Sequence, residues 1–336
     1  MQRVGLIFLD RPGISEQIRL ARYAEERGFD SVWVCETRLA RDAVTPLAAF
    51  ATATQRVKLG AGVVNNWTRT SALMAMTFAT LAELAPGRVI LGIGSSWEPL
   101  AWKQGVERRK TLRAMREYVE VVRRLLALES VTLEGEVVKV RDLRLDLGHG
   151  VPQEPIGVPI YIGATGPRMM ELAGEIADGI LHNFFTSPQY LRRSLERARN
   201  GAERAKRPLE SIDMAQMIGV SMSQDAEEAR NTARSLLAMY IGQQPHIARA
   251  SGVAEDLIDR IHDRLGGWPP SPGGLEEATP LVSDSVVDLL SASGTPEMCR
   301  QRVQGYLDAG ASFPVLCPLT PNVEEIIDTF APEGSS

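Results

Sequence analysis

Short apolar runs alternate with longer amphipathic stretches along almost all of the 336 residues. Eight runs have the length and composition of buried strands: 4–9, 31–35, 57–64, 88–94, 159–163, 178–184, 214–223 and 313–319. Helical patterns lie between them, for example at 15–28, 108–129 and 225–242. The runs are apolar on both faces, as in parallel strands covered by helices. The alternation predicts an α/β fold, and eight strands favour a (β/α)8 TIM barrel over the alternative, an open doubly wound sheet.

Two places break the regular spacing of the runs. Residues 130–157 have the pattern of a small hairpin and a loop inserted after a long helix. Residues 243–290, which include the breaker-rich GGWPPSPGG, form a long excursion between the seventh and eighth strands. Long segments of this kind are usually lids or binding loops. We therefore expect one barrel domain over 1–330 with these two insertions, and a short C-terminal tail over 331–336.

The charge balance and the cysteines exclude several classes of protein. A net charge of −5 offers no basic surface for nucleic acid or an anionic membrane. No window approaches the roughly 18 uninterrupted apolar residues of a membrane span. The first apolar run ends at Asp10, which makes it too short for a signal peptide. Cys35, Cys299 and Cys317 are too far apart for a disulfide framework or a zinc site. We expect a cytoplasmic protein without a metal, a nucleic-acid partner or a membrane partner.

Residues 161–179, YIGATGPRMMELAGEIADG, place four glycines and a proline where a strand pattern becomes a helical one. Free amides and the helix dipole attract anions at such a turn, and small residues let a phosphate come close. A tight turn without a ligand is the alternative, whereas a dinucleotide fingerprint is disfavoured because G-x-G-x-x-G does not occur. We predict a phosphate cradle after the fifth strand, built from Gly163, Ala164, Thr165, Gly166, Pro167 and Arg168.

Polar residues follow other predicted strands. Glu36, Thr37 and Arg38 follow the second strand, and Ser95, Ser96, Trp97 and Glu98 follow the fourth. The third strand contains two glycines, which suggests a bulge or the close approach of a ligand. Because the carboxyl ends of barrel strands share one face, these segments and the phosphate cradle would surround a single mouth.

His182 lies near the end of the sixth predicted strand. It is a candidate for the same mouth, and a hydrogen-bonded structural histidine is an equal alternative. The four histidines show no metal-ligand spacing, and neither a Ser–His–Asp arrangement nor HExxH is present.

Several of these stretches together resemble the luciferase-like monooxygenase superfamily, specifically its deazaflavin (coenzyme F-420) branch. The likeness is greatest to the methylenetetrahydromethanopterin reductases and extends over nearly the whole chain. The stretches are DSVWVCETR, VKLGAGVVNNWTR, FATLAELAPGRVILGIGSSWEPLA, PIYIGATGPRMMELAGEIADGIL, SIDMAQMIGVSMSQD and SGTPEMCRQRV. The resemblance implies a (β/α)8 barrel with insertions, a homo-oligomer (we expect a dimer), and a cofactor across the C-terminal mouth.

The resemblance also implies where the cofactor is bound. Its phosphate would lie on the backbone amides of residues 163–168, and a non-prolyl cis peptide bond would join Gly62 to Val63. Val63, Val64 and Asn65 would touch the deazaflavin ring or its polar edge. Ser95 and Ser96 would lie near the cofactor side chain.

The chain departs from the methanopterin reductases at positions that handle protons. Ile7 stands where those enzymes carry a glutamate, Glu36-Thr37 replaces Asp-His, and Asn65-Asn66 replaces Asn-Pro. The scaffold and cofactor site therefore carry over, but the proton-handling residues do not. Glu36 and Glu98 are our candidates for a general acid or base, with a structural ion pair as the alternative for each.

The expected reaction is hydride transfer between reduced F-420 and an unsaturated small-molecule substrate containing C=C, C=N or C=O. Trp67, Trp97 and Trp102 could form apolar walls, and the 243–290 excursion could cap the substrate. Two alternatives remain at this point: an FMN-dependent two-component monooxygenase and a non-catalytic flavin-binding protein.

Overall fold

Eight parallel strands form a closed ring in the computed structural model, which describes residues 3–36, 38–151 and 153–332. Gly5 pairs with Ser31 on one side and with Val315 on the other, which closes the ring. The strands in ring order are β1 (Gly5–Phe8), β2 (Ser31–Val34), β3 (Lys58–Ala61), β5 (Val89–Gly94), β8 (Ile160–Ala164), β9 (Gly179–His182), β10 (Asp213–Met222) and β12 (Phe313–Pro318). The predicted (β/α)8 barrel is confirmed, and the open sheet is wrong. Thr37 and the tail residues 333–336 lie outside the described residues.

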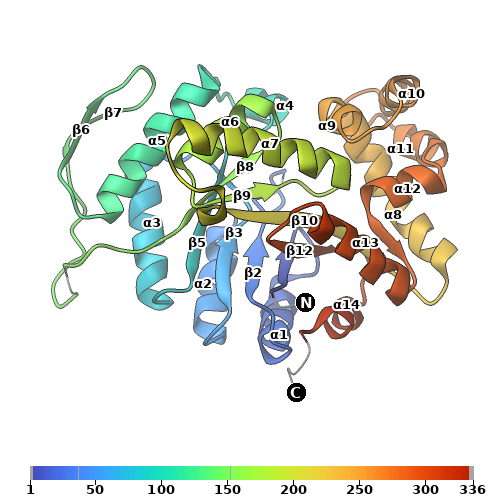
Figure 1. Ribbon diagram of the computed structural model, residues 1–336, viewed down its shortest axis with the longest axis horizontal. Coiled ribbons are helices and arrows are strands. Elements are labelled where there is room, and N and C mark those ends of the chain that lie inside the picture. Colours follow the sequence, from blue (N-terminus) through green and yellow to red (C-terminus); the bar gives the residue numbers. More distant parts are fainter. Residues whose placement is uncertain (1–2, 37, 152, 333–336) are drawn as a thin grey trace.

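Helices cover the outside of this barrel (Figure 1). Helix α1 shows why they form: Leu20, Ala21 and Ala24 lie on one buried face, and Gly28 follows its end with a φ of +77°. The helices outside the excursion are α1 (Ile14–Glu26), α2 (Val44–Ala53), α3 (Ser71–Leu84), α4 (Glu98–Lys103), α5 (Thr111–Leu126), α6 (Pro167–Ile176), α7 (Pro188–Arg204), α8 (Ala226–Gln243), α13 (Pro296–Asp308) and α14 (Val323–Phe330).

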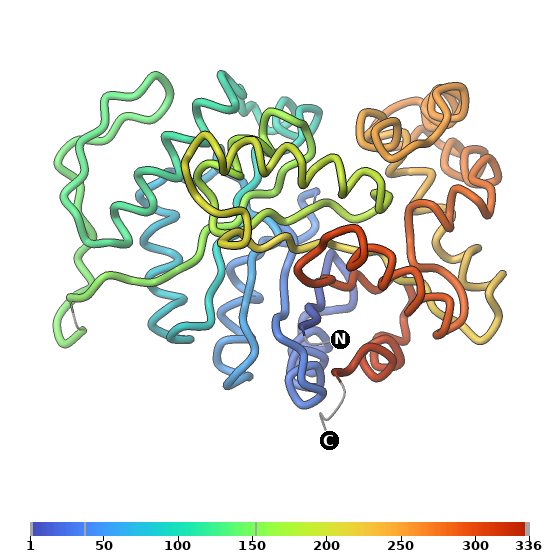
Figure 2. The backbone as a smooth tube through the Cα atoms, viewed as in Figure 1, coloured from blue at the N-terminus to red at the C-terminus, as the bar shows by residue number. Residues whose placement is uncertain are grey.

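Two additions lie on opposite sides of the barrel, at the two ends of the molecule's longest dimension (Figure 2). One is an antiparallel hairpin of β6 (Val131–Glu134) and β7 (Lys139–Leu143), within the segment predicted to hold a hairpin. The other is the excursion after α8, which contains α9 (Pro245–Ala250), α10 (Glu255–Leu265), α11 (Gly274–Ala278) and α12 (Asp284–Leu290). Two short strands were not predicted: β4 (Val64–Asn65) beside β5, and β11 (Ala292–Gly294) beside β10.

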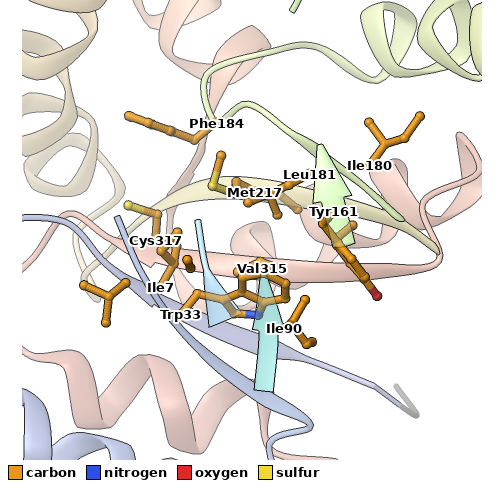
Figure 3. Packing of buried hydrophobic residues seen from close by; sticks show 14 of the residues in the cluster. Ile7, Trp33, Ile90, Tyr161, Ile180, Leu181, Phe184, Met217, Val315 and Cys317 are labelled. Atoms are coloured by element: carbon orange, nitrogen blue, oxygen red, sulfur yellow. The ribbon is translucent and has the colours of Figure 1, made fainter. Parts of the chain in front are cut away.

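Large apolar side chains fill the barrel interior (Figure 3). Trp33 is fully buried, and its indole N–H donates to Ser31 Oγ at 2.8 Å. Gly60 makes room for this ring, because a Cβ at that position would lie 2.1 Å from it. Ile7 and Leu181 approach Gly62, where a Cβ would lie 2.8 Å from the Ile7 side chain and 3.1 Å from the Leu181 side chain. The interior is therefore a packed core and not a channel.

Ionic groups close the N-terminal end of the barrel. Arg3 donates to both carboxylate oxygens of Asp213, at 3.0 and 3.1 Å, and the Tyr161 hydroxyl donates to the same carboxylate. Asp30 lies 3.5 Å from Arg3 and 3.3 Å from Lys58. Each of these charges therefore has a partner of opposite sign.

None of the described helices combines the length and the apolar character needed to cross a bilayer. Within the same residues, no group of three or more His, Cys, Asp or Glu side chains is arranged to hold a metal ion.

Candidate functional site

The candidate site lies at the C-terminal end of the barrel, where the segments after β2, β3, β5 and β8 meet. Strand β3 ends at Ala61, and pairing with β5 resumes at Val64, opposite Ile93. The peptide bond between Gly62 and Val63 is cis, as the resemblance implied. The predicted bulge is therefore present in the third barrel strand.

Val63 fills space that two glycines leave open, Gly94 on β5 and Gly163 on β8. A Cβ on Gly94 would lie 2.5 Å from Val63 Cγ2, and one on Gly163 would lie 2.9 Å from Val63 Cγ1. Both distances are shorter than side chains tolerate, so Val63 can occupy this place only beside glycines. We expected Gly163 to make room for a phosphate; the structure shows that it makes room for Val63.

The phosphate cradle, residues 163–168, begins at the end of β8 and continues into the first turn of α6. Gly166 is the N-cap of α6, no side chain caps the helix, and a Cβ at this position would meet nothing within 4 Å. The N–H groups of Thr165 and Gly166 donate to no other described residue. The Thr165 carbonyl oxygen accepts a hydrogen bond from the Tyr190 hydroxyl at 2.8 Å. This end of α6 thus has the open space and free donors that an anion needs.

The other residues of the cradle are placed less favourably for contact with a ligand. Ala164 is buried, and Pro167 occupies the first helical turn. Arg168 is exposed and lines a surface groove of about 730 Å³ between α5 and α6. The cation predicted to face the phosphate therefore lies along the outside of the helical layer.

Glu36 belongs to a polar cluster with Asn65 and Arg69. Arg69 Nη1 lies 2.7 Å from Glu36 Oε1, and Asn65 Nδ2 donates to Glu36 Oε2 at 3.2 Å. The other amide atom of Asn65, Oδ1, accepts from the N–H groups of Trp67 and Thr68, each at 3.0 Å. Both charged side chains are less than one-fifth exposed. Glu36 is thus held in one orientation at the mouth.

Glu98, the second predicted acid, is the first residue of α4. It pairs with Arg108 at 2.6 Å, but its side chain is 65% exposed. Ser95 and Ser96 lie between β5 and α4, and Ser96 has a φ of +61°. The Ser95 carbonyl oxygen accepts the indole N–H of Trp67 at 3.1 Å. Of the two acids, Glu36 is therefore the more enclosed.

An aromatic contact joins the rim of the mouth to the excursion. The rings of Trp97 and Trp268 lie 5.1 Å apart in an edge-to-face arrangement, and the Lys103 ammonium lies 5.4 Å from the Trp268 ring. Trp268 is part of GGWPPSPGG, so this segment reaches back to the loop after β5. Trp102, in contrast, is 75% exposed.

His182 is fully buried, and neither ring nitrogen has a hydrogen-bond partner among the described residues. Burial lowers the pKa of His182 to about 4. Side chains alternate along a strand, and its neighbour Leu181 points into the barrel beside Gly62. His182 therefore points outward, beneath the helices, which corrects our expectation that it could face the mouth.

Sequence reasoning missed three contributors to the mouth. Arg69 fixes Glu36, Tyr190 binds the cradle carbonyl, and Trp268 closes the rim. Arg69 lies in the stretch VKLGAGVVNNWTR, and Trp268 lies in the breaker-rich segment GGWPPSPGG. Both segments had been connected with the mouth from the sequence, so both residues could have been named as candidates. Tyr190 lies on the buried face of α7 and looks like an ordinary core residue.

Comparisons with known proteins agree with this architecture. The family model for luciferase-like monooxygenase matches residues 3–312. The chain is 31% identical to 5,10-methylenetetrahydromethanopterin reductase from Methanolobus tindarius, over 98% of each chain. It is 32% identical to F-420-dependent glucose-6-phosphate dehydrogenase from Nakamurella multipartita, over 89% of this chain and 85% of the relative.

A solved structure gives the same result in three dimensions. The coenzyme F-420-dependent tetrahydromethanopterin reductase of Methanopyrus kandleri superposes with a TM-score of 0.86 at 26% identity, over 98% of this chain and 97% of the other. The barrel architecture and the extent of these matches lead to one assignment. The chain belongs to the luciferase-like monooxygenase family, on its branch of coenzyme F-420-dependent oxidoreductases.

Proposed function

We propose that the protein binds coenzyme F-420 across the C-terminal mouth and catalyses hydride transfer to or from an unsaturated small organic substrate with a C=C, C=N or C=O bond. One observation carries the proposal: the Val63 bulge after β3 and the open, uncapped start of α6 after β8 lie at the same mouth, on either side of β5, and Val63 packs against Gly163 at the end of β8. When bound, the deazaflavin ring supplies the hydride chemistry. The protein's part is to hold the ring, orient the substrate and manage a proton.

The residues present fit the cofactor at two points. The free N–H groups of Thr165 and Gly166 are suited to a phosphate, because they combine unsatisfied donors with the positive end of a helix. Val63 supplies an apolar surface on which a planar ring can lie, supported from behind by β5 and β8. Asn65, fixed by its own hydrogen bonds, is beside that surface.

Glu36 is our candidate for the group that holds or moves the proton. Its carboxylate already accepts hydrogen bonds from Arg69 and Asn65, which fix both the side chain and its orientation. A positioned carboxylate of this kind can act as a general acid or base when it reaches the substrate. The Trp97–Trp268 contact would help to exclude water once the mouth is occupied.

Anaerobic titration of the apoprotein with F-420 and with FMN tests the cofactor assignment. The wild type should retain F-420, and Gly166→Glu should weaken its affinity at least tenfold, because a carboxylate would meet the phosphate. Gly157→Glu is the matched control, since Gly157 also has open space around it but precedes β8 at the opposite end of the barrel. Unchanged affinity in Gly166→Glu would refute the cradle, and retention of FMN alone would favour the monooxygenase alternative.

We also propose that the protein is a homodimer. Leu73, Met76 and Leu84 are exposed on α3, and their spacing places them along one side of the helix. A second copy of the chain could cover this apolar surface. Light scattering should give twice the mass of one chain, and Met76→Glu should shift the mass toward the monomer; a monomeric wild type would contradict the proposal.

A further inference from the structure

Arg38 is a cation at the mouth without a counterion among the described residues. It follows β2, and the described part of the chain offers its guanidinium one contact: Nη1 lies 3.6 Å from the thioether sulfur of Met239. Sulfur is a weak acceptor, and Arg38 forms no ion pair with any described carboxylate. Burial lowers the pKa of Arg38, because the charged guanidinium is less well solvated here than in water. A cation in such surroundings costs free energy unless an anion joins it.

Tyr240 is a second unsatisfied group close to Arg38. It lies on α8, is 4% exposed, and its hydroxyl makes no hydrogen bond within the described chain. The side chain of Asn183 lies beside the hydroxyl without completing such a bond. Phe184 and Phe185 hold the ring in place, with centroids 5.1 and 5.3 Å away. Few buried hydroxyls in proteins remain without a partner.

The two groups approach each other from distant parts of the chain. The Arg38 guanidinium contacts the sulfur of Met239, which precedes Tyr240 on α8, so the loop after β2 meets this helix next to Tyr240. Burial raises the pKa of Tyr240, and the charge of Arg38 opposes that rise. Tyr190, on α7, donates to the Thr165 carbonyl oxygen of the phosphate cradle.

Asp10 is the described carboxylate that could neutralise Arg38 from the loop after β1. The negative charge of Asp10 favours the charged form of Arg38, but the two side chains form no ion pair, and Asp10 is exposed to solvent. Glu36 is only two residues away in the chain, yet it is already paired with Arg69. The guanidinium therefore keeps unused donors beside the mouth.

We propose that Arg38 and Tyr240 together bind an anionic group of the substrate, a carboxylate or a phosphate. A guanidinium recognises either group through paired hydrogen bonds, and a phenolic hydroxyl adds a third donor. The inference rests on the proposed function, because it assigns the substrate class of the same mouth. It restricts the acceptors to unsaturated small molecules that carry a negatively charged group.

Matched pairs of probes test this inference on the F-420-loaded protein by isothermal titration calorimetry. Pyruvate against acetone tests a carboxylate, and glucose 6-phosphate against glucose tests a phosphate. The wild type should bind the charged member of at least one pair tenfold or more tightly. Arg38→Gln should abolish that preference, Arg38→Lys should keep part of it, and Tyr240→Phe should weaken charged-probe binding about threefold to tenfold.

Arg41→Gln is the matched control, because Arg41 lies in the same loop and donates to the Pro12 carbonyl oxygen at 3.1 Å. It should keep the wild-type preference, and circular dichroism should show that all variants are folded. Equal binding of charged and neutral probes by the wild type would overturn the inference. So would an equal loss in Arg41→Gln, or a loss of F-420 affinity in Arg38→Gln, which would assign the anion to the cofactor. Failure of the proposed function is a separate result: the wild type would not retain F-420.

Discussion

The two ends of the barrel differ in how their polar groups are satisfied. At the N-terminal end, Arg3, Asp213 and Tyr161 form a closed network in which each charge has a partner. At the C-terminal end, no described carboxylate pairs with Arg38, and no described residue hydrogen-bonds the Tyr240 hydroxyl. Our proposals follow the division common to barrel enzymes, in which the N-terminal end contributes stability and the C-terminal end carries the ligand site.

Positive backbone φ angles at non-glycine residues occur at both ends of the barrel. Arg38, Leu39 and Ser96 have φ values of 23°, 63° and 61° in loops at the C-terminal end. Leu128 and Lys206, with φ values of 59° and 54°, follow α5 and α7. Backbone conformation therefore does not separate the two ends in the way that the polar groups do.

The largest expected effect is on turnover, and it distinguishes Glu36 from Glu98, the two candidate acids at the C-terminal mouth. Glu36→Gln should lower turnover about 10²- to 10⁴-fold if Glu36 is the general acid or base. Glu98→Gln should change turnover less than about twofold, because an exposed rim carboxylate is readily replaced by water. Steady-state kinetics with reduced F-420 would measure both. Full turnover in Glu36→Gln would remove the assignment, and full turnover in both variants would remove the two acids from the mechanism.

A substitution in the ionic network at the N-terminal end should change the free energy of unfolding and not the affinity for a ligand. Asp213→Asn removes the charge partner at 3.0 Å and leaves Arg3 with the longer ion pair to Asp30, and we expect a loss of about 2 kcal/mol in the free energy of unfolding. The loss stays below that of a fully buried pair because both side chains are about one-third exposed. Denaturant unfolding should show the loss, and F-420 affinity should stay unchanged. A variant that loses F-420 affinity instead would break the division between the ends.

The same substitution has a defined pH dependence. Burial alone would raise the pKa of Asp213, but hydrogen bonds from Arg3 and Tyr161 lower it below its ordinary value of 3.8. A carboxylate with a lowered folded pKa stabilises the protein above the unfolded pKa, and this contribution is lost as the pH falls through the folded pKa. The stability difference between wild type and Asp213→Asn should therefore be constant near neutral pH and shrink below about pH 4.

The smallest effect distinguishes two glycines of the phosphate cradle. Gly163→Ala should cost about 1–3 kcal/mol of stability and weaken F-420 binding, because the new methyl group would displace Val63. Gly166→Ala should cost only about 0.5 kcal/mol, as alanine is a poorer N-cap but meets no neighbour. Thermal unfolding with and without F-420 measures both. Equal costs for the two substitutions would contradict the packing role of Gly163.

The sequence was sufficient to predict the barrel, because its eight buried strands are continuous apolar runs. It was insufficient for β11, since Ala292, Ser293 and Gly294 have little strand propensity and form a strand only beside β10. The turn after β8 was also predictable, because glycines and Pro167 mark the change from strand to helix.

The sequence could not show which way a side chain points or what it meets. We expected that His182 could face the mouth. Successive side chains of a strand point to opposite faces, so an error of one residue in the predicted alternation places a side chain on the wrong face. The partnership of Glu36 with Arg69 and the nearness of Arg38 to Tyr240 depend on how the closed ring folds. Tyr240 lies in a helix with the pattern of core packing, and nothing local marks its hydroxyl as unsatisfied.

Val63 has a consequence for any redesign of this scaffold. Its isopropyl group occupies room left jointly by Gly94 and Gly163, so three stretches of chain together set the height of the surface on which we propose the ring lies. Shortening residue 63 would leave a void under that surface, so a protein engineer who wants to admit a bulkier substrate would do better to change residues elsewhere around the mouth.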